Sequence, residues 1–89
     1  MINQWSVYIL RCVDGSFYTG ITNNIKRRLE EHNNSKTVGS KYVRARRPVV
    51  LVYKQQTESR SEALKKEQEI KKLSRILKIA LIGGPVAQR

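Results

Sequence analysis

The chain has 89 residues, 39% of them hydrophobic, which suffices for one domain with a modest core and excludes two. Its 18 lysines and arginines against 7 acidic residues give a net charge of +11, which favours a polyanionic partner such as nucleic acid. No segment approaches the roughly 18 apolar residues of a membrane-spanning helix, and the N-terminus lacks a signal-peptide pattern. We therefore expect a cytoplasmic protein with no membrane partner. Cys12 is the single cysteine, which excludes an internal disulfide, and we expect it to be buried.

The first elements predicted along the chain are two strands. Residues 5–13 are rich in β-branched and aromatic side chains, and Asp14-Gly15 follows as a hairpin signal. Residues 17–21 then form the returning strand. A helix follows, with Asn23 as its cap and Ile25 and Leu29 as its apolar edge, and it ends near residues 33–34.

The second half of the chain predicts a loop, a strand and two helices. Residues 35–48 have no clear period and many cations, which indicates a loop with a short helical turn. Residues 49–53 are apolar throughout and predict a third strand that is central or well covered. Ser59 and Glu62 fit a capping box at the start of the next helix. Ser74 starts a last helix that runs to residue 82. We expect one α+β domain over residues 1–82, with residues 83–89 as a flexible tail.

Four polar residues of the first half are candidates for a shared site. Tyr8 and Tyr18 lie on the two predicted strands, where a tyrosine is more often a core residue with its hydroxyl at the rim. Arg28 and His32 are four residues apart on the first helix, so both side chains can reach one cleft beside the sheet. A solvated helix face explains these two about as well.

Glu67 is harder to explain as a surface residue. It falls on the apolar stripe of its helix, between Ala63 and Ile70, so its carboxylate faces the core. An unpaired buried carboxylate costs several kcal/mol, so Glu67 requires a cationic partner, a metal ion or a water-filled pocket. A structural ion pair, with Arg28 as one candidate, and a functional role are both open.

This combination resembles the GIY-YIG nucleases. The first signature element matches Ser6-Val7-Tyr8 and the second matches Tyr18-Thr19-Gly20; the arginine, histidine and glutamate follow in the expected order. The similarity covers nearly the whole chain and is greatest to the small stand-alone bacterial members. Three positions depart from the pattern. Ser6 replaces a glycine, Thr19 replaces an aliphatic residue, and Ile21 stands where some repair nucleases of the family have a lysine.

The resemblance implies a small three-stranded antiparallel sheet flanked by helices, and hydrolysis of DNA phosphodiesters with one divalent metal, Mg²⁺ or Mn²⁺. It makes Glu67 the metal ligand and gives catalytic roles to Tyr8, Tyr18, Arg28 and His32. In this interpretation Arg28 stabilises transition-state charge and Tyr18 orients or deprotonates the attacking water. Tyr8 or His32 relays a proton or holds the phosphate.

One geometric condition follows for the hairpin. A strict two-residue Asp14-Gly15 turn pairs Arg11 with Tyr18, which places Tyr8 and Tyr18 on opposite faces of the sheet. A shared site therefore requires one additional residue, as a three-residue Asp14-Gly15-Ser16 loop or a bulge of one residue. We predict that additional residue.

Cations and one aromatic residue of the helix and loop predict a nucleic-acid interface without base specificity. These residues are Lys26, Arg27, Lys36, Lys41, Tyr42, Arg44, Arg46 and Arg47. DNA is favoured over RNA as the partner, and a separate protein is a candidate source of specificity.

Two alternatives to a DNA endonuclease remain open. One is a nucleic-acid-binding module without efficient turnover, and the other is a ribosome- or RNA-associated basic domain. Binding alone requires no carboxylate on the inward stripe of a helix, so Glu67 favours the endonuclease.

Overall fold

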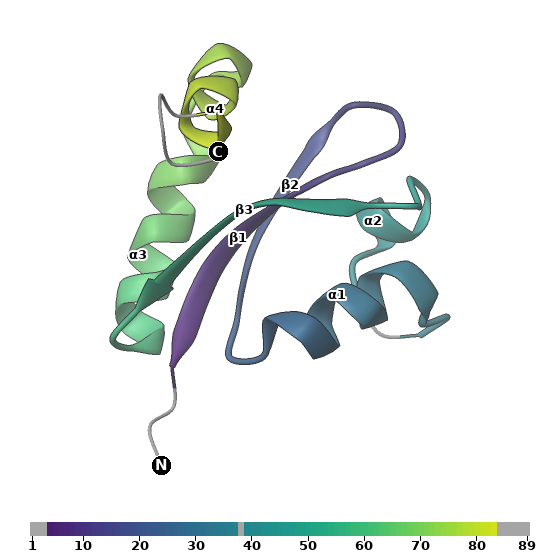
Figure 1. Ribbon diagram of the computed structural model, residues 1–89, viewed down its shortest axis with the longest axis horizontal. Helices are drawn as coiled ribbons and strands as arrows, with labels where there is room; N and C mark the ends of the chain where they lie inside the picture. The colour runs from purple at the N-terminus through teal and green to yellow at the C-terminus, as the bar shows by residue number, and fades with distance from the viewer. Residues whose placement is uncertain (1–3, 38, 84–89) are drawn as a thin grey trace.

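The computed structural model describes residues 4–37 and 39–83. Within these residues the element order is β1-β2-α1-α2-β3-α3-α4, and the three strands form one antiparallel sheet in the order β2-β1-β3. Helices cover both faces of the sheet (Figure 1). The predicted α+β class is confirmed.

The hairpin of β1 (Trp5–Arg11) and β2 (Phe17–Thr22) contains the predicted additional residue. Leu10 pairs with Tyr18, and Cys12 donates its backbone N–H to the carbonyl of Ser16 at 2.8 Å. Three residues, 13–15, therefore form the loop, one position earlier than the predicted Asp14-Gly15-Ser16, and Gly15 adopts the left-handed conformation with a φ of 86°. This register places Tyr8 and Tyr18 on the same face of the sheet.

Strand β3 (Val50–Thr57) pairs with the other side of β1 and lies at the edge of the sheet. The sequence predicts that residues 49–53 are central or well covered; the strand is not central, and its cover is partial, since Val49 is buried while Val50 is 52% exposed. The strand is also longer than predicted, because its C-terminal half alternates between exposed and half-buried side chains as an edge strand does. The central strand is β1, which has four consecutive buried residues that face alternately to the two sides.

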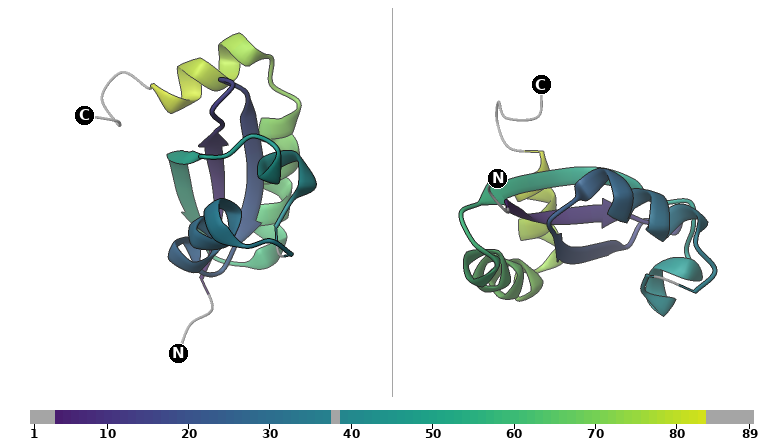
Figure 2. Two further views of the ribbon diagram at one scale, coloured as in Figure 1. Left: turned by 90° about the vertical axis from the view of Figure 1, so that its right-hand side faces the viewer. Right: turned by 90° about the horizontal axis from the view of Figure 1, so that it is seen from below.

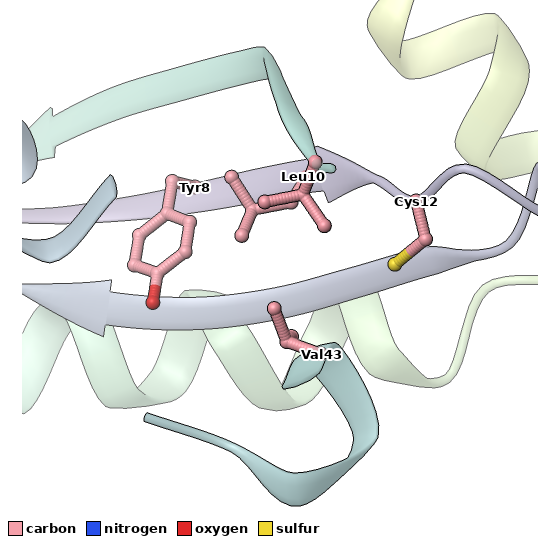
Figure 3. Close-up of a cluster of buried hydrophobic side chains, with 5 residues drawn as sticks. Tyr8, Leu10, Cys12 and Val43 are labelled. Carbon is pink, nitrogen blue, oxygen red and sulfur yellow. The ribbon is translucent and has the colours of Figure 1, made fainter. Parts of the chain in front are cut away.

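The two faces of the sheet carry separate cores. On one face Tyr8 and Leu10 of β1, with Cys12 just after the strand, pack toward Val43 of α2 (Lys41–Arg44), as Figure 3 shows. Helix α1 (Ile25–Asn34) covers the same face. On the other face Val7 and Ile9 pack against Ile70 of α3 (Arg60–Lys71), and α4 (Arg75–Ile82) closes this core. Figure 2 shows α1 and α3 on opposite sides of the sheet.

Side-chain caps set where the helices begin. The Asn24 side chain accepts the N–H of Arg27, so Asn24 caps α1 and the prediction of Asn23 is wrong by one residue. Ser59 caps α3 as predicted. The Glu62 carboxylate accepts the backbone N–H of Glu58, the residue before the cap, so the reciprocal bond of a capping box is shifted by one residue.

The C-terminal end agrees with the prediction as far as the structure describes it. Ser74 caps α4, and Gly83 follows it as the C-cap. The predicted flexible tail, apart from Gly83, lies outside the described residues. Among the helices of residues 4–37 and 39–83, none is long and apolar enough to cross a membrane.

Candidate active site

Tyr8 reaches across the sheet over Gly20. These two residues are direct partners in the β1–β2 register. A Cβ atom at Gly20 would lie 2.6 Å from the Tyr8 hydroxyl oxygen, closer than real Cβ contacts. Figure 3 shows the hydroxyl of Tyr8 over the neighbouring strand β2. Gly20 is therefore needed because it leaves room for the Tyr8 phenol to extend to the β2 edge.

The imidazole of His32, a residue of α1, contacts the Tyr8 hydroxyl between the helix and the sheet. The Nε2 atom lies 2.9 Å from the Tyr8 oxygen, and both side chains are buried. Burial lowers the pKa of His32 to about 4, and the positive charges of Arg28 and Arg47 act in the same direction. The imidazole is therefore neutral at pH 7. Its Nδ1 atom has no hydrogen-bond partner among the described residues.

Arg28 brings a positive charge to the same hydroxyl. Its guanidinium donates to the Glu31 carboxylate at 3.0 Å and lies beside Tyr8. Burial alone lowers the pKa of Arg28, but the interactions with Glu31 and Tyr8 outweigh it and raise the pKa. For Tyr8 burial prevails over the effect of Arg28 and raises the pKa to about 12. Tyr8 is therefore a neutral phenol in the free protein.

Tyr18 completes an aromatic cluster with these residues. Its ring centroid lies 6.5 Å from that of Tyr8 and 5.3 Å from that of His32, in an edge-on arrangement with the latter. On its other side the ring stacks with Tyr42 of α2 at 6.4 Å. The Tyr18 side chain thus joins the buried pair to the surface.

Glu67 reaches this cluster from the opposite layer. Helix α3 contacts both β1 and β2, and β2 is an edge strand, so a side chain of α3 can approach the site around that edge. Glu67 is 9% exposed, and its charge is close enough to Tyr8 to raise the pKa of that phenol. The anticipated ion pair with Arg28 is replaced by one with Lys71, 3.5 Å away.

The structure thus brings together all five residues that the sequence suggested for catalysis. It collects two phenols, one guanidinium, one neutral imidazole and one carboxylate at the β2 edge. Within residues 4–37 and 39–83 no group of three or more histidine, cysteine or acidic side chains could hold a metal ion. Glu67 is the carboxylate of this cluster, so a metal ion here would have one protein carboxylate.

The predicted interface residues fall into two sets. The lysines at positions 26, 36 and 41 are exposed, and so is most of the Arg27 side chain. They lie on or near the ends of α1 and α2, with Tyr42 among them. Arg27 pairs with Glu31 at 3.6 Å but stays largely exposed, so it and the three lysines are accessible to phosphates.

The three arginines of the same segment have protein partners. Arg44 donates to the carbonyl of Gly39, and Arg46 pairs with Asp14 at 3.1 Å and lies over the Tyr42 ring.

Arg47 donates to three carbonyls at the end of α1, those of Glu31, His32 and Ser35. Arg47 therefore closes the C-terminus of α1, which holds the backbone of His32 in place.

The sequence reasoning missed two features of the site. Asn33 exchanges two hydrogen bonds with the backbone of Val49, which ties α1 to the start of β3. Lys71 and Lys78 lie near Tyr18 and Tyr42 in one groove. The position of Lys71 four residues after Glu67 was a signal for the first lysine. We find no signal in the sequence that would have placed Lys78 or Asn33.

Residues 4–78 match the family described as the GIY-YIG catalytic domain, and the chain belongs to this nuclease family. Its relatives include a UPF0213 protein of Desulfotalea psychrophila, 54% identical over 78 residues that span 88% of this chain and 70% of the relative. A UPF0213 protein of Staphylococcus saprophyticus is 50% identical over 77 residues, 86% of this chain and 92% of the relative.

Two solved structures resemble this one. They are the solution structures of a UPF0213 protein from Bacillus halodurans, with a TM-score of 0.56, and of a protein from E. faecalis, with a TM-score of 0.61. Each is 44% identical and covers 92% of this chain and 88% of its own. The predicted resemblance to small stand-alone bacterial members is confirmed.

Proposed function

We propose that this protein is a metal-dependent endonuclease that hydrolyses DNA phosphodiester bonds, with the cluster at the β2 edge as its active site. The observation that carries the proposal is the position of Glu67. Its carboxylate is nearly buried, and its charge acts on the Tyr8 phenol, whose pKa it helps to raise. A structural ion pair with Lys71 could form anywhere along an exposed helix and would not require this location.

The residues present fit a hydrated divalent cation. Mg²⁺ and Mn²⁺ prefer carboxylate oxygen and keep several waters, and substrate phosphates supply further ligands, so Glu67 alone suffices as the protein carboxylate. Its only counter-charge within ion-pair distance among the described residues is the half-exposed ammonium of Lys71. When bound, the cation would neutralise phosphate charge and lower the pKa of a coordinated water.

Arg28 and Tyr18 have the positions that hydrolysis requires. The guanidinium of Arg28 stays charged at every working pH, since its pKa is raised, and its planar fork suits the oxygens of a phosphate in the transition state. The Tyr18 ring packs against Tyr8 and also lines the groove, which supports the proposed role of its hydroxyl in orienting an attacking water.

In the free protein Tyr8 and His32 act as hydrogen-bonding groups and not as a proton donor and its accepting base. Burial raises the pKa of Tyr8 and lowers that of His32, so both groups stay neutral and proton transfer from Tyr8 to His32 is unfavourable in the free protein. The neutral Tyr8 hydroxyl therefore acts as a buried hydrogen-bonding group of the site, and His32 fixes the direction of that hydroxyl.

The exposed cations at the ends of α1 and α2 supply the DNA contacts of this proposal. A side chain that only meets the phosphate backbone carries no sequence information, so binding is expected to be insensitive to base sequence. A separate protein partner would be one route to greater specificity.

Nicking of supercoiled plasmid tests the proposal. We expect conversion to the open-circular form with Mg²⁺ or Mn²⁺ and none with EDTA. Arg28→Ala and Glu67→Gln should each remove the activity while the proteins still fold and bind DNA. Binding without nicking in the wild-type protein, under any of these metal conditions, would favour the alternative of a binding module.

A further inference from the structure

A groove beside Glu67 contains positive charge that the mechanism above leaves unused. Strand β2 and the helices α2, α3 and α4 each contribute to its walls, and no lining residue is acidic: Phe17, Tyr18, Thr19, Tyr42, Lys71 and Lys78. Since Tyr18 belongs both to this groove and to the catalytic cluster, the groove borders the site.

Lys71 connects the groove to Glu67. Its Nζ atom is 3.5 Å from the Glu67 carboxylate, yet 49% of its side chain is exposed, whereas the Glu67 side chain is only 12% exposed. The ammonium therefore lies between a nearly buried anion and an open groove. Four flexible methylene groups let it turn to either side.

Lys78 adds a second cation from α4. The part of the chain that the structure describes places no acidic side chain within ion-pair distance of Lys78. By contrast, the guanidinium groups of Arg44, Arg46 and Arg47 already donate to protein carbonyls or a carboxylate. Among the described residues Lys78 thus has no competing acidic partner, and the one ion pair of Lys71 is with Glu67 itself.

We propose that the groove binds the phosphate backbone of the DNA substrate through Lys71 and Lys78. When a divalent cation binds Glu67, the Lys71 ammonium leaves this carboxylate and pairs with a DNA phosphate instead. This inference rests on the proposed function. A divalent cation at Glu67 repels the neighbouring ammonium, and a polyanion in the groove attracts it. In the free protein Lys71 neutralises the carboxylate that the metal requires.

A double-mutant cycle in EDTA tests this exchange without using activity. The probe is a fluorescently labelled DNA duplex, and its affinity is measured by anisotropy over a range of salt concentrations. Glu67→Gln should release Lys71, so DNA binding tightens several-fold and the slope of log K against log salt steepens by about 0.9, the value for one additional phosphate contact. Adding Lys71→Met to this variant should remove both gains.

The same helix offers a matched control. Glu69 pairs with Lys66 at 3.9 Å, away from the groove, and Glu69→Gln removes the same charge. We expect this variant to leave the salt slope at the wild-type value. Lys78→Met should lower the slope by about 0.9, whereas Lys66→Met should not. Equal effects of Glu67→Gln and Glu69→Gln, or a gain that survives Lys71→Met, would overturn the proposal.

Metal binding gives an independent measurement. Lys71→Met removes the cation that competes at Glu67, so stabilisation by Mn²⁺ in thermal melts should begin at lower concentration than in wild type. An unchanged or higher Mn²⁺ requirement would contradict the exchange. If the cycle fails while wild type nicks plasmid and Glu67→Gln does not, the groove assignment falls and the nuclease proposal stands. If the cycle succeeds while no protein nicks plasmid, the groove assignment stands and the nuclease proposal falls.

Discussion

The Tyr8 hydroxyl and the Nε2 atom of His32 lie 2.9 Å apart although 24 residues separate them in the chain. The first is on the central strand β1, and the second is near the end of α1. Both side chains are at most 1% exposed, so the bond forms only if helix and sheet are packed together. The active site is thus part of the core that supports the fold.

The neutral His32 predicts a defined loss of stability in acid. Its pKa falls from an ordinary 6.5 to about 4 on folding, so the unfolded chain binds the proton more tightly. Stability should be complete above pH 6.5 and decline as the pH falls toward 4, by about 3 kcal/mol in total. Urea unfolding between pH 7 and 4 gives the free energy of unfolding of wild type and of His32→Gln. The difference between the two values removes the contribution of the carboxylates, which both proteins share. If the free energies of unfolding of the two proteins declined in parallel as the pH falls, the prediction of a lowered His32 pKa would be wrong.

Gly20→Ala should damage the site through packing alone. The new Cβ would lie 2.6 Å from the Tyr8 oxygen, so the phenol must move away from His32, at a cost of about 1–3 kcal/mol in stability. The rate of plasmid nicking should also fall. Gly83→Ala is the control, because Gly83 has a negative φ and the nearest atom to an added Cβ is at 3.4 Å. Equal melting temperatures for the two variants would contradict the close contact.

Tyr18→Phe separates catalysis from packing. The substitution keeps the ring that stacks with Tyr42 and removes only the hydroxyl. Unfolding should therefore change little, and DNA affinity should persist, while nicking falls about a hundredfold or more, as expected for a group that acts in the transition state. Full activity in Tyr18→Phe would end the assignment of its hydroxyl to the attacking water.

Arg47 and Lys41 should respond oppositely to substitution. Arg47→Ala removes three hydrogen bonds at the end of α1, so it should destabilise the protein by about 1–3 kcal/mol. Lys41→Ala should leave stability within about 0.5 kcal/mol and weaken DNA binding for all sequences alike. Thermal melts and binding at two salt concentrations distinguish the roles. A stable Arg47→Ala protein with weakened binding would instead place Arg47 in the interface.

The sequence predicted the local features of the fold well. The hairpin, the caps at Ser59 and Ser74 and the inward position of Glu67 all follow from patterns within a few residues. The extra loop residue followed from requiring Tyr8 and Tyr18 to share a face. Each of these predictions depends on local periodicity or turn chemistry.

The features that the sequence did not reveal depend on long-range packing. The apolar run at residues 49–53 fits a central strand, but β1 takes that position because helices cover both of its faces. Arg47 and Asn33 bond to backbone atoms of distant segments, and such acceptors leave no residue pattern. The choice of Lys71 over Arg28 as partner of Glu67 is also a matter of which face each helix occupies.

The central claim is that Glu67 is a metal ligand, and Glu67→Gln beside Glu69→Gln tests it most directly. Melting temperature with and without Mn²⁺ and nicking of plasmid are measured on both variants. Because Lys71 is half exposed, loss of its partner should change stability by no more than about 1 kcal/mol. Glu67→Gln should lose the Mn²⁺ stabilisation and nick at least about a hundredfold more slowly, while Glu69→Gln resembles wild type. A Glu67→Gln protein that is strongly destabilised yet nicks DNA normally would show that Glu67 is a structural ion-pair residue and would contradict this account.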